Sequence, residues 1–144
     1  MRDLFAVVVL ALASAAAHAT ADDRVVEEML KHTSGIGAED IRRNYDACDS
    51  GVMRSMKLCA SYRWTAQDIR LNAVYKRLRE QTDKADAVSL VNAQRAWLAY
   101  RDAECAFEGS AGAGGGTEEG LYVLSCKEDL TRQQADRLAA FGHE

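Results

Sequence analysis

The chain lacks proline altogether, since none of its 144 residues is Pro. Proline interrupts helices more strongly than any other residue, and the helix-favouring Ala, Leu, Glu, Gln, Arg and Lys are abundant. The chain also lacks an excess of positive charge, with 18 Lys and Arg against 22 Asp and Glu and a net charge of −4. This balance argues against a nucleic-acid-binding module and is compatible with a cationic protein partner. The length is that of a single domain with a modest core.

A long apolar run is missing too. The apolar stretch at residues 4–13 is shorter than the roughly 20 residues that span a bilayer. With Arg2 before it and Ala17-His18-Ala19 after it, the stretch has the form of a signal peptide over residues 1–19 rather than of an uncleaved anchor. No cysteine follows it that could carry a lipid. We therefore expect a periplasmic or secreted protein with no stable membrane insertion after cleavage, divided into a lead-in at 20–47 and a helical domain at 48–141.

The sequence has no Cys-x-x-Cys pair, and its three histidines are not spaced with the cysteines as metal ligands would be. We therefore predict neither a metal site nor a cofactor. An even number of cysteines in a small exported domain indicates disulfides, which would join Cys48, Cys59, Cys105 and Cys126. Spacing alone leaves two pairings open, Cys48–Cys59 with Cys105–Cys126, or Cys59–Cys105 with Cys48–Cys126.

The most informative stretch is residues 94–105, Gln-Arg-Ala-Trp-Leu-Ala-Tyr-Arg-Asp-Ala-Glu-Cys. Steps of three and four residues place one stripe of a helix on a single face: Leu90, Gln94, Trp97, Arg101 and Cys105. Gln94 and Arg101 are polar residues in the middle of this otherwise apolar face. Each needs a buried partner, because an unsatisfied polar group costs on the order of 1–3 kcal/mol.

Partners for both residues follow from a helical hairpin. One long helix is expected from residue 49 or 50 to about Thr82, with a break near 59–64 left open, and a second from about Lys84 to Phe107. A short turn makes them antiparallel, so that residues whose numbers sum to about 168 face each other. This register places Leu71 beside Trp97, the Tyr75 hydroxyl beside Gln94, and Asp68 in a bidentate pair with Arg101. Asp102 should point outward, away from Arg101.

Residues 109–116, Gly-Ser-Ala-Gly-Ala-Gly-Gly-Gly, should form neither helix nor strand. A third helix should begin near Glu118 and Glu119 and end by Gly142. The loop at 112–119 is the candidate binding segment, with the residues Gly114, Gly115, Gly116, Glu118 and Glu119. The alternative is that the same residues form an ordinary solvated linker with no binding role. In the lead-in, a short helix near residues 25–30 and another near 39–45 flank a break at 34–37. Whether they are flexible or packed on the bundle stays open.

These motifs resemble the LprI-type lysozyme-inhibitor domain, a family of small exported bacterial proteins. The resemblance covers roughly residues 45–138 and lies mainly in the Gln-x-x-Trp-Leu-x-Tyr-Arg-Asp-x-x-Cys run at 94–105. It implies a helical domain with the local pairings Cys48–Cys59 and Cys105–Cys126. The expected fold is all-α, a small antiparallel bundle of about three main helices with a variable N-terminal segment and two disulfides. The motif residues belong to its core: Asp68, Leu71, Tyr75, Gln94, Trp97 and Arg101.

The resemblance implies a binding protein that occludes a lysozyme-like glycosidase, whose cleft carries paired carboxylates. The alternative is an envelope structural or stress-related interaction protein without lysozyme activity, which an exposed apolar patch at residues 25–30 would favour. An enzyme is not expected, and no catalytic residue is assigned. The chain shows no nucleophile–base pair, and its glycine run lacks the Lys and Ser/Thr of a phosphate-binding loop. A deep pocket around Asp68 and Arg101 would favour an enzyme.

Overall fold

The computed structural model describes residues 21–141, and this part of the chain consists of helices and short connections, with no strand. Its five helices are α1 (Asp23–His32), α2 (Ala38–Asp46), α3 (Met53–Gln81), α4 (Lys84–Ala113) and α5 (Glu119–Phe141). Two disulfides join Cys48 to Cys59 and Cys105 to Cys126. The predictions of an all-helical chain and of these two bridges are therefore confirmed. The expected signal peptide at 1–19 lies outside the described residues.

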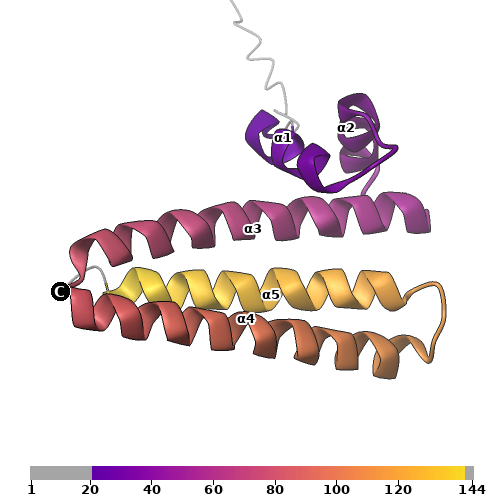
Figure 1. The fold of residues 1–144 in the computed structure, drawn as a ribbon. Helices are drawn as coiled ribbons and strands as arrows, with labels where there is room; N and C mark the ends of the chain where they lie inside the picture. Colours follow the sequence, from indigo (N-terminus) through magenta and orange to yellow (C-terminus); the bar gives the residue numbers. More distant parts are fainter. Residues whose placement is uncertain (1–20, 142–144) are drawn as a thin grey trace, which may run out of the picture.

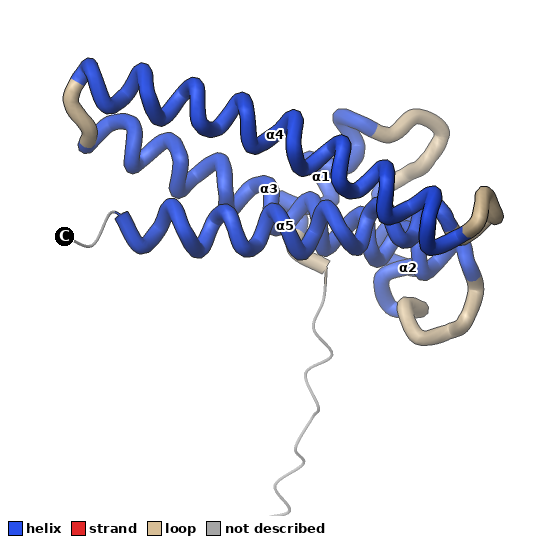
Figure 2. Tube along the Cα trace, turned by 90° about the horizontal axis from the view of Figure 1, so that it is seen from below, coloured by secondary structure: helices blue, strands red, loops and turns tan. Residues whose placement is uncertain are grey.

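The three long helices α3, α4 and α5 lie side by side (Figure 1). The helix α5 packs against both α3 and α4, whereas α3 and α4 contact each other little. The short helices α1 and α2 contact each other and α3, and Figure 1 shows them on the side of α3 that is turned away from α5. In the view from below, α4 lies at one edge of the long helices (Figure 2). The lead-in, which contains α1 and α2, is therefore packed on the bundle. The sequence alone left open whether it is packed or flexible.

Contacts across the long helices define their direction. Arg63 pairs with Glu128 and Arg70 with Asp136, so residues of α3 meet residues of α5 that lie 65 or 66 positions later. A constant difference means that the two helices run parallel. Cys105 is bonded to Cys126, and Arg101 contacts Thr131. These numbers sum to 231 and 232, and a nearly constant sum means that α4 and α5 run antiparallel.

The apolar core has two parts, one on each side of α3. One joins α1 and α2 to α3 through the buried side chains of Val25, Val26, Met29, Ile41, Leu58 and Tyr62. The other joins α3 to α5, with Trp97 and Leu90 of α4 packed against it, through Leu71, Val74, Ala135 and Leu138. Because Val25, Val26 and Met29 are buried, residues 25–30 do not form the exposed apolar patch that would have favoured the alternative function.

The start of α3 differs from the prediction. The helix begins at Met53, after a turn at residues 47–50 that places Cys48 beside Cys59, and it runs without a break through 59–64. Asp49 and Ser50 therefore lie outside the helix, and the N-cap is Val52, which makes no side-chain hydrogen bond. The break before α4 is as expected, because the Asp83 side chain accepts a hydrogen bond from the backbone N–H of Asp86 and caps the helix.

The prediction that residues 109–116 hold no helix is wrong for 109–113, which belong to α4. Packing explains the difference. A Cβ atom on Gly109 would lie 2.4 Å from Cγ2 of Val123, so glycine at this position is what lets α5 approach the α4 backbone. The helix stops at Gly114, whose φ of 56° is left-handed and whose N–H donates to Ser110 O. Phe107 is therefore not the end of the second helix.

Candidate functional site

The predicted binding segment forms the tip of the α4–α5 hairpin and is shorter than expected. Gly112 lies in α4 and Glu119 opens α5, so the connection consists of residues 114–118 only, here called the tip. Gly114, Gly115, Gly116 and Glu118 are exposed, and Glu119 is half-buried. Among residues 21–141, neither Glu118 nor Glu119 is in an ion pair. The two carboxylates are therefore free to meet a positively charged partner.

The helices below the tip are tied together. The bridge Cys105–Cys126, with 5.4 Å between its Cα atoms, is buried on both sides. Between this bridge and the tip, Gly109 contacts Val123, and a Cβ on Gly112 would sit 3.2 Å from the ring of Tyr122. The two ends of the tip are therefore held close together.

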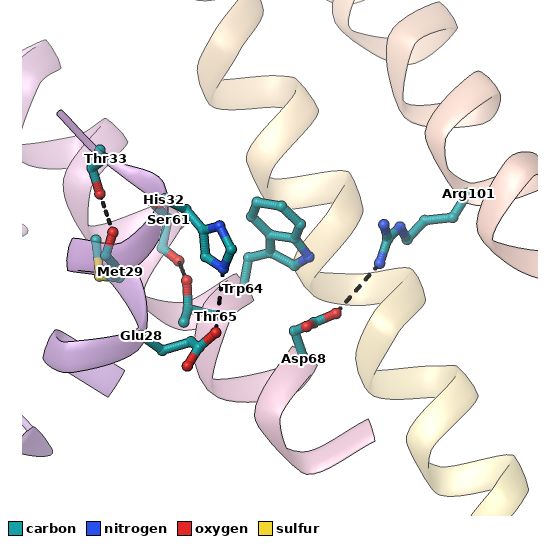
Figure 3. Close-up of a pocket in the computed structure, with 9 residues that line it drawn as sticks. All are labelled: Glu28, Met29, His32, Thr33, Ser61, Trp64, Thr65, Asp68 and Arg101. Carbon is teal, nitrogen blue, oxygen red and sulfur yellow. Dashed lines mark hydrogen bonds and ion pairs between the residues drawn. The ribbon is translucent and has the colours of Figure 1, made fainter. Parts of the chain in front are cut away.

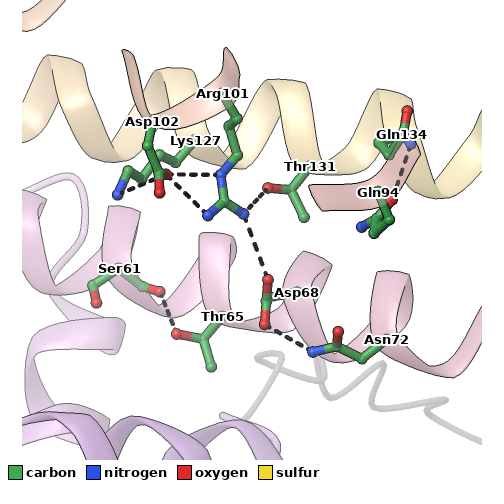
Figure 4. Close-up of polar contacts among 10 residues, drawn as sticks. All are labelled: Ser61, Thr65, Asp68, Asn72, Gln94, Arg101, Asp102, Lys127, Thr131 and Gln134. Carbon is green, nitrogen blue, oxygen red and sulfur yellow. Dashed lines mark hydrogen bonds and ion pairs between the residues drawn. The ribbon is translucent and has the colours of Figure 1, made fainter. Parts of the chain in front are cut away.

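Arg101 is the buried charge of the bundle, with only 6% of its surface exposed. Its Nε and Nη2 atoms donate to Asp102 Oδ1 at 3.1 and 3.0 Å, and Nη1 donates to Thr131 Oγ1 at 3.4 Å (Figure 4). Asp68 Oδ1 lies 3.7 Å from Nη1. The predicted Asp68–Arg101 proximity is therefore present, but as one long contact rather than a bidentate pair. The prediction that Asp102 points away from Arg101 is wrong, because Asp102 is the closer carboxylate.

Aromatic rings and a lysine complete this polar centre. The guanidinium carbon of Arg101 lies 5.7 Å from the Trp64 ring centre and 5.3 Å from that of Trp97. Lys127 Nζ lies 4.9 Å from the Trp64 ring centre and 3.3 Å from Asp102 Oδ1. Partial burial raises the pKa of the Asp102 carboxyl, but hydrogen bonds from Arg101 and the charges of Arg101 and Lys127 outweigh it and lower the pKa overall. Asp102 is therefore held ionised.

Gln94 has a partner on a different helix from the one expected. Its Oε1 accepts a hydrogen bond of 3.1 Å from Gln134 Nε2 on α5, in place of the expected Tyr75 hydroxyl (Figure 4). The residues that sequence reasoning missed around this polar centre are all on α5: Lys127, Thr131 and Gln134. A sequence signal existed for Thr131, because its position follows the apolar spacing of that helix.

A pocket of about 360 Å³ opens between α1, α3 and the Arg101 side chain (Figure 3). It is lined by Glu28, Met29, His32, Thr33, Ser61, Trp64, Thr65, Asp68 and Arg101. Its two carboxylates already have partners: Glu28 Oε1 is 3.2 Å from His32 Nε2, and Asp68 Oδ2 accepts from Asn72. The buried Nε1 of Trp64 has no hydrogen-bond partner among the described residues. Hydrogen bonds from Lys31 and then His32 lower the pKa of Glu28, the opposite of what a general acid needs. The pocket therefore lacks the arrangement of an acid–base site.

Two further properties concern residues 21–141 as a whole. No helix in this part of the chain combines the length and apolar character needed to cross a bilayer. Likewise, no three His, Cys, Asp or Glu side chains within it gather as metal ligands would.

Comparison with known proteins gives two matches. The family model described as "Lysozyme inhibitor LprI" matches residues 46–138, well over half of the chain. The uncharacterized protein R02472 of Rhizobium meliloti (strain 1021) is 34% identical over 96 residues, which cover 58% of this chain and 68% of that protein. No solved structure matches the chain significantly. The family match contains both disulfides and the tip, and it leaves out α1 and all but the last residue of α2.

Proposed function

The chain belongs to the lysozyme inhibitor LprI family, and from this membership we propose that it is an exported protein that binds and occludes a lysozyme-like glycosidase. It acts by binding rather than by catalysis and uses no metal or cofactor. Its partner is a protein and not a nucleic acid, in keeping with a net charge of −4. Its two disulfides suit an oxidising compartment outside the cytoplasm. Residues 1–19 direct the protein there and are then removed, which leaves a mature protein that is not inserted in the membrane.

The observation that carries the proposal is the exposed tip on its two joined helices. Glycines 114–116 have no side chains, so this segment is thin enough to enter a substrate cleft without placing a carboxylate beside the paired carboxylates of the enzyme. Glu118 and Glu119 stand behind the glycines, at the start of α5. There they would meet the positively charged rim of a cationic lysozyme and steer the encounter.

The test is a cell-wall lysis assay with oxidised residues 20–144 and lysozymes of several types. We expect inhibition that weakens at high salt, because screening reduces steering between exposed charges. The variant Glu118→Lys with Glu119→Lys should raise the inhibition constant about tenfold or more, which is about 1.4 kcal/mol. The matched control is Glu27→Lys with Glu80→Lys, two exposed carboxylates remote from the tip, and it should inhibit like the parent protein.

Two results would contradict the proposal. Absence of inhibition against every lysozyme type would remove the function itself. If the tip variant inhibits as well as the parent protein, the proposed function would stand, but the contact surface would have to lie outside the tip. Absence of inhibition would favour the alternative function, an envelope interaction protein without lysozyme activity.

A further inference from the structure

The outer face of α4 carries a regular stripe of exposed residues. Ala93, Ala96, Tyr100, Ala103 and Phe107 are all exposed and follow one another at steps of three, four, three and four residues. Ser89 and Ser110, also exposed, extend the same spacing at both ends. This alternation matches the spacing of a coiled-coil seam, in which each such residue would pack against a partner helix. In the described part of the chain, α4 packs its other side on α5. Only the start of the stripe, Ser89 and Ala93, borders a groove that it shares with α3 and α5.

The stripe is apolar where a solvated helix face should be polar. Tyr100 exposes 53% and Phe107 67% of its surface, and Val88, beside the stripe, exposes 61%. A soluble monomer that needs no partner here would carry Lys or Glu at such positions. The three alanines leave the helix backbone open to close approach, because two helices with small residues between them pack at about 8 Å.

We propose that α4 pairs with α4 of a second copy of this chain in an antiparallel, two-fold symmetric dimer. Size complementarity within the stripe argues for this occupant. In an antiparallel pair whose facing residue numbers sum to 203, Tyr100 meets Ala103 of the other copy and Phe107 meets Ala96, and symmetry repeats both contacts. Each large ring then fills a hole above an alanine. A parallel pair would instead set Tyr against Tyr and Ala against Ala, and leave both clashes and gaps.

The size of the face fits a dimer of modest stability. The stripe from Ser89 to Ser110 is about 32 Å long at a rise of about 1.5 Å per residue. Each aromatic ring still has roughly 100 Å² to bury, taking its exposed fraction of the area such side chains cover. With the small residues, both copies together would bury on the order of 1,000 Å², which is the lower bound for a specific interface. In this register the tip of each copy lies level with the first turns of α4 of the other copy, so the two tips are at opposite ends of the pair and do not meet.

The experiment is sedimentation equilibrium of oxidised residues 20–144 from about 5 to about 300 µM. We expect reversible dimerisation in this range. The double variant Ala96→Glu with Ala103→Glu should weaken dimerisation at least tenfold, because the dimer would bury the new carboxylates against the aromatic rings. In the monomer the two glutamates are exposed, and Glu is a good helix former, so α4 should stay intact. The matched control, Ala73→Glu with Ala140→Glu, adds the same charge at exposed positions of α3 and α5 and should dimerise like the parent protein. Circular dichroism checks that each variant is folded.

The direction of the pair is tested by the distance between spin labels attached through a non-natural residue at position 110. The antiparallel register places the two labelled backbones about 27 Å apart, and a parallel pair about 10 Å. A monomer over the whole range, or a dimer unaffected by the two glutamates on α4, would overturn the proposal. A short distance between the labels would overturn its antiparallel register.

Discussion

Arg101 provides the sharpest test of how the bundle is held together, because two carboxylates from different helices share one buried guanidinium. The arginine side chain is 7% exposed, whereas those of Asp68 and Asp102 are 39% and 53% exposed. Removing one carboxylate leaves the other in place. Removing both leaves a buried cation with only Thr131 and two aromatic rings around it.

The expected magnitudes follow from these contacts. Asp102 makes two charge-assisted hydrogen bonds, worth about 1.5–3 kcal/mol in a buried site, and its exposure reduces this to about 1–2 kcal/mol. Asp68, at 3.7 Å, should contribute about 0.5–1 kcal/mol. The double variant should lose about 3–5 kcal/mol, the cost of an uncompensated buried charge. The loss should therefore exceed the sum of the two single losses.

The assay is a double-mutant cycle with Asp68→Asn and Asp102→Asn, measured by urea unfolding with far-ultraviolet circular dichroism. The exposed pair Arg70–Asp136 provides the control, since Asp136→Asn should cost less than about 1 kcal/mol. Losses that add to within about 0.5 kcal/mol would refute the reasoning, because they would show that the two carboxylates act independently. A large loss from Asp68→Asn alone would show that Asp68, and not Asp102, is the main partner.

Two further outcomes follow from the same structure. The stabilisation due to Asp102 should depend on pH, because the pKa of its carboxyl is lower in the folded protein than the unfolded value of about 3.9. The quantity to measure is the difference in unfolding free energy between the parent protein and Asp102→Asn. This difference should be constant above about pH 5 and vanish as the pH falls through the folded pKa. A difference that grows as the pH falls below about 5 would contradict this sign. Gly109→Ala should destabilise the protein by about 1–3 kcal/mol in urea unfolding, because the new methyl group meets Val123 at 2.4 Å. Gly120→Ala, whose nearest neighbour is the flexible Lys57 side chain at 3.5 Å, should stabilise it by up to about 1 kcal/mol, and equal effects of the two changes would contradict the packing argument.

The sequence predicted well what depends on local chemistry. The turn before α4 lies where the sequence predicts it, and the structure shows Asp83 as its N-cap. The Asp68–Arg101 proximity follows from this short turn, which makes α3 and α4 antiparallel. Prediction from the sequence failed where a third helix provides the side-chain partner. The helix α5 packs against both α3 and α4, so Gln94 finds Gln134 there and not Tyr75 on α3. No two-helix register could have shown this.

The glycine run shows a second kind of limit. Glycine lowers helix propensity by about 1 kcal/mol per residue, so reading 109–113 as loop was reasonable from propensity alone. Close packing reverses that preference, because only glycine at 109 allows Val123 to approach. The lead-in was undecidable for a similar reason: its docking depends on contacts distant in sequence, such as the hydrogen bond from Asp22 N to the Tyr62 hydroxyl.

The arrangement of the motif residues explains why family membership does not identify the target. Gln94, Arg101 and Cys105 are buried, and they hold α4 against α5 through Gln134, Thr131 and Cys126. A partner protein cannot touch these side chains, so they can define the fold of many relatives without defining what each one binds. We expect recognition to come from exposed side chains instead, and the tip is the proposed contact surface. The tip joins the same two helices that the buried motif residues hold together, so a relative could change its target by changing exposed side chains while keeping the same interior.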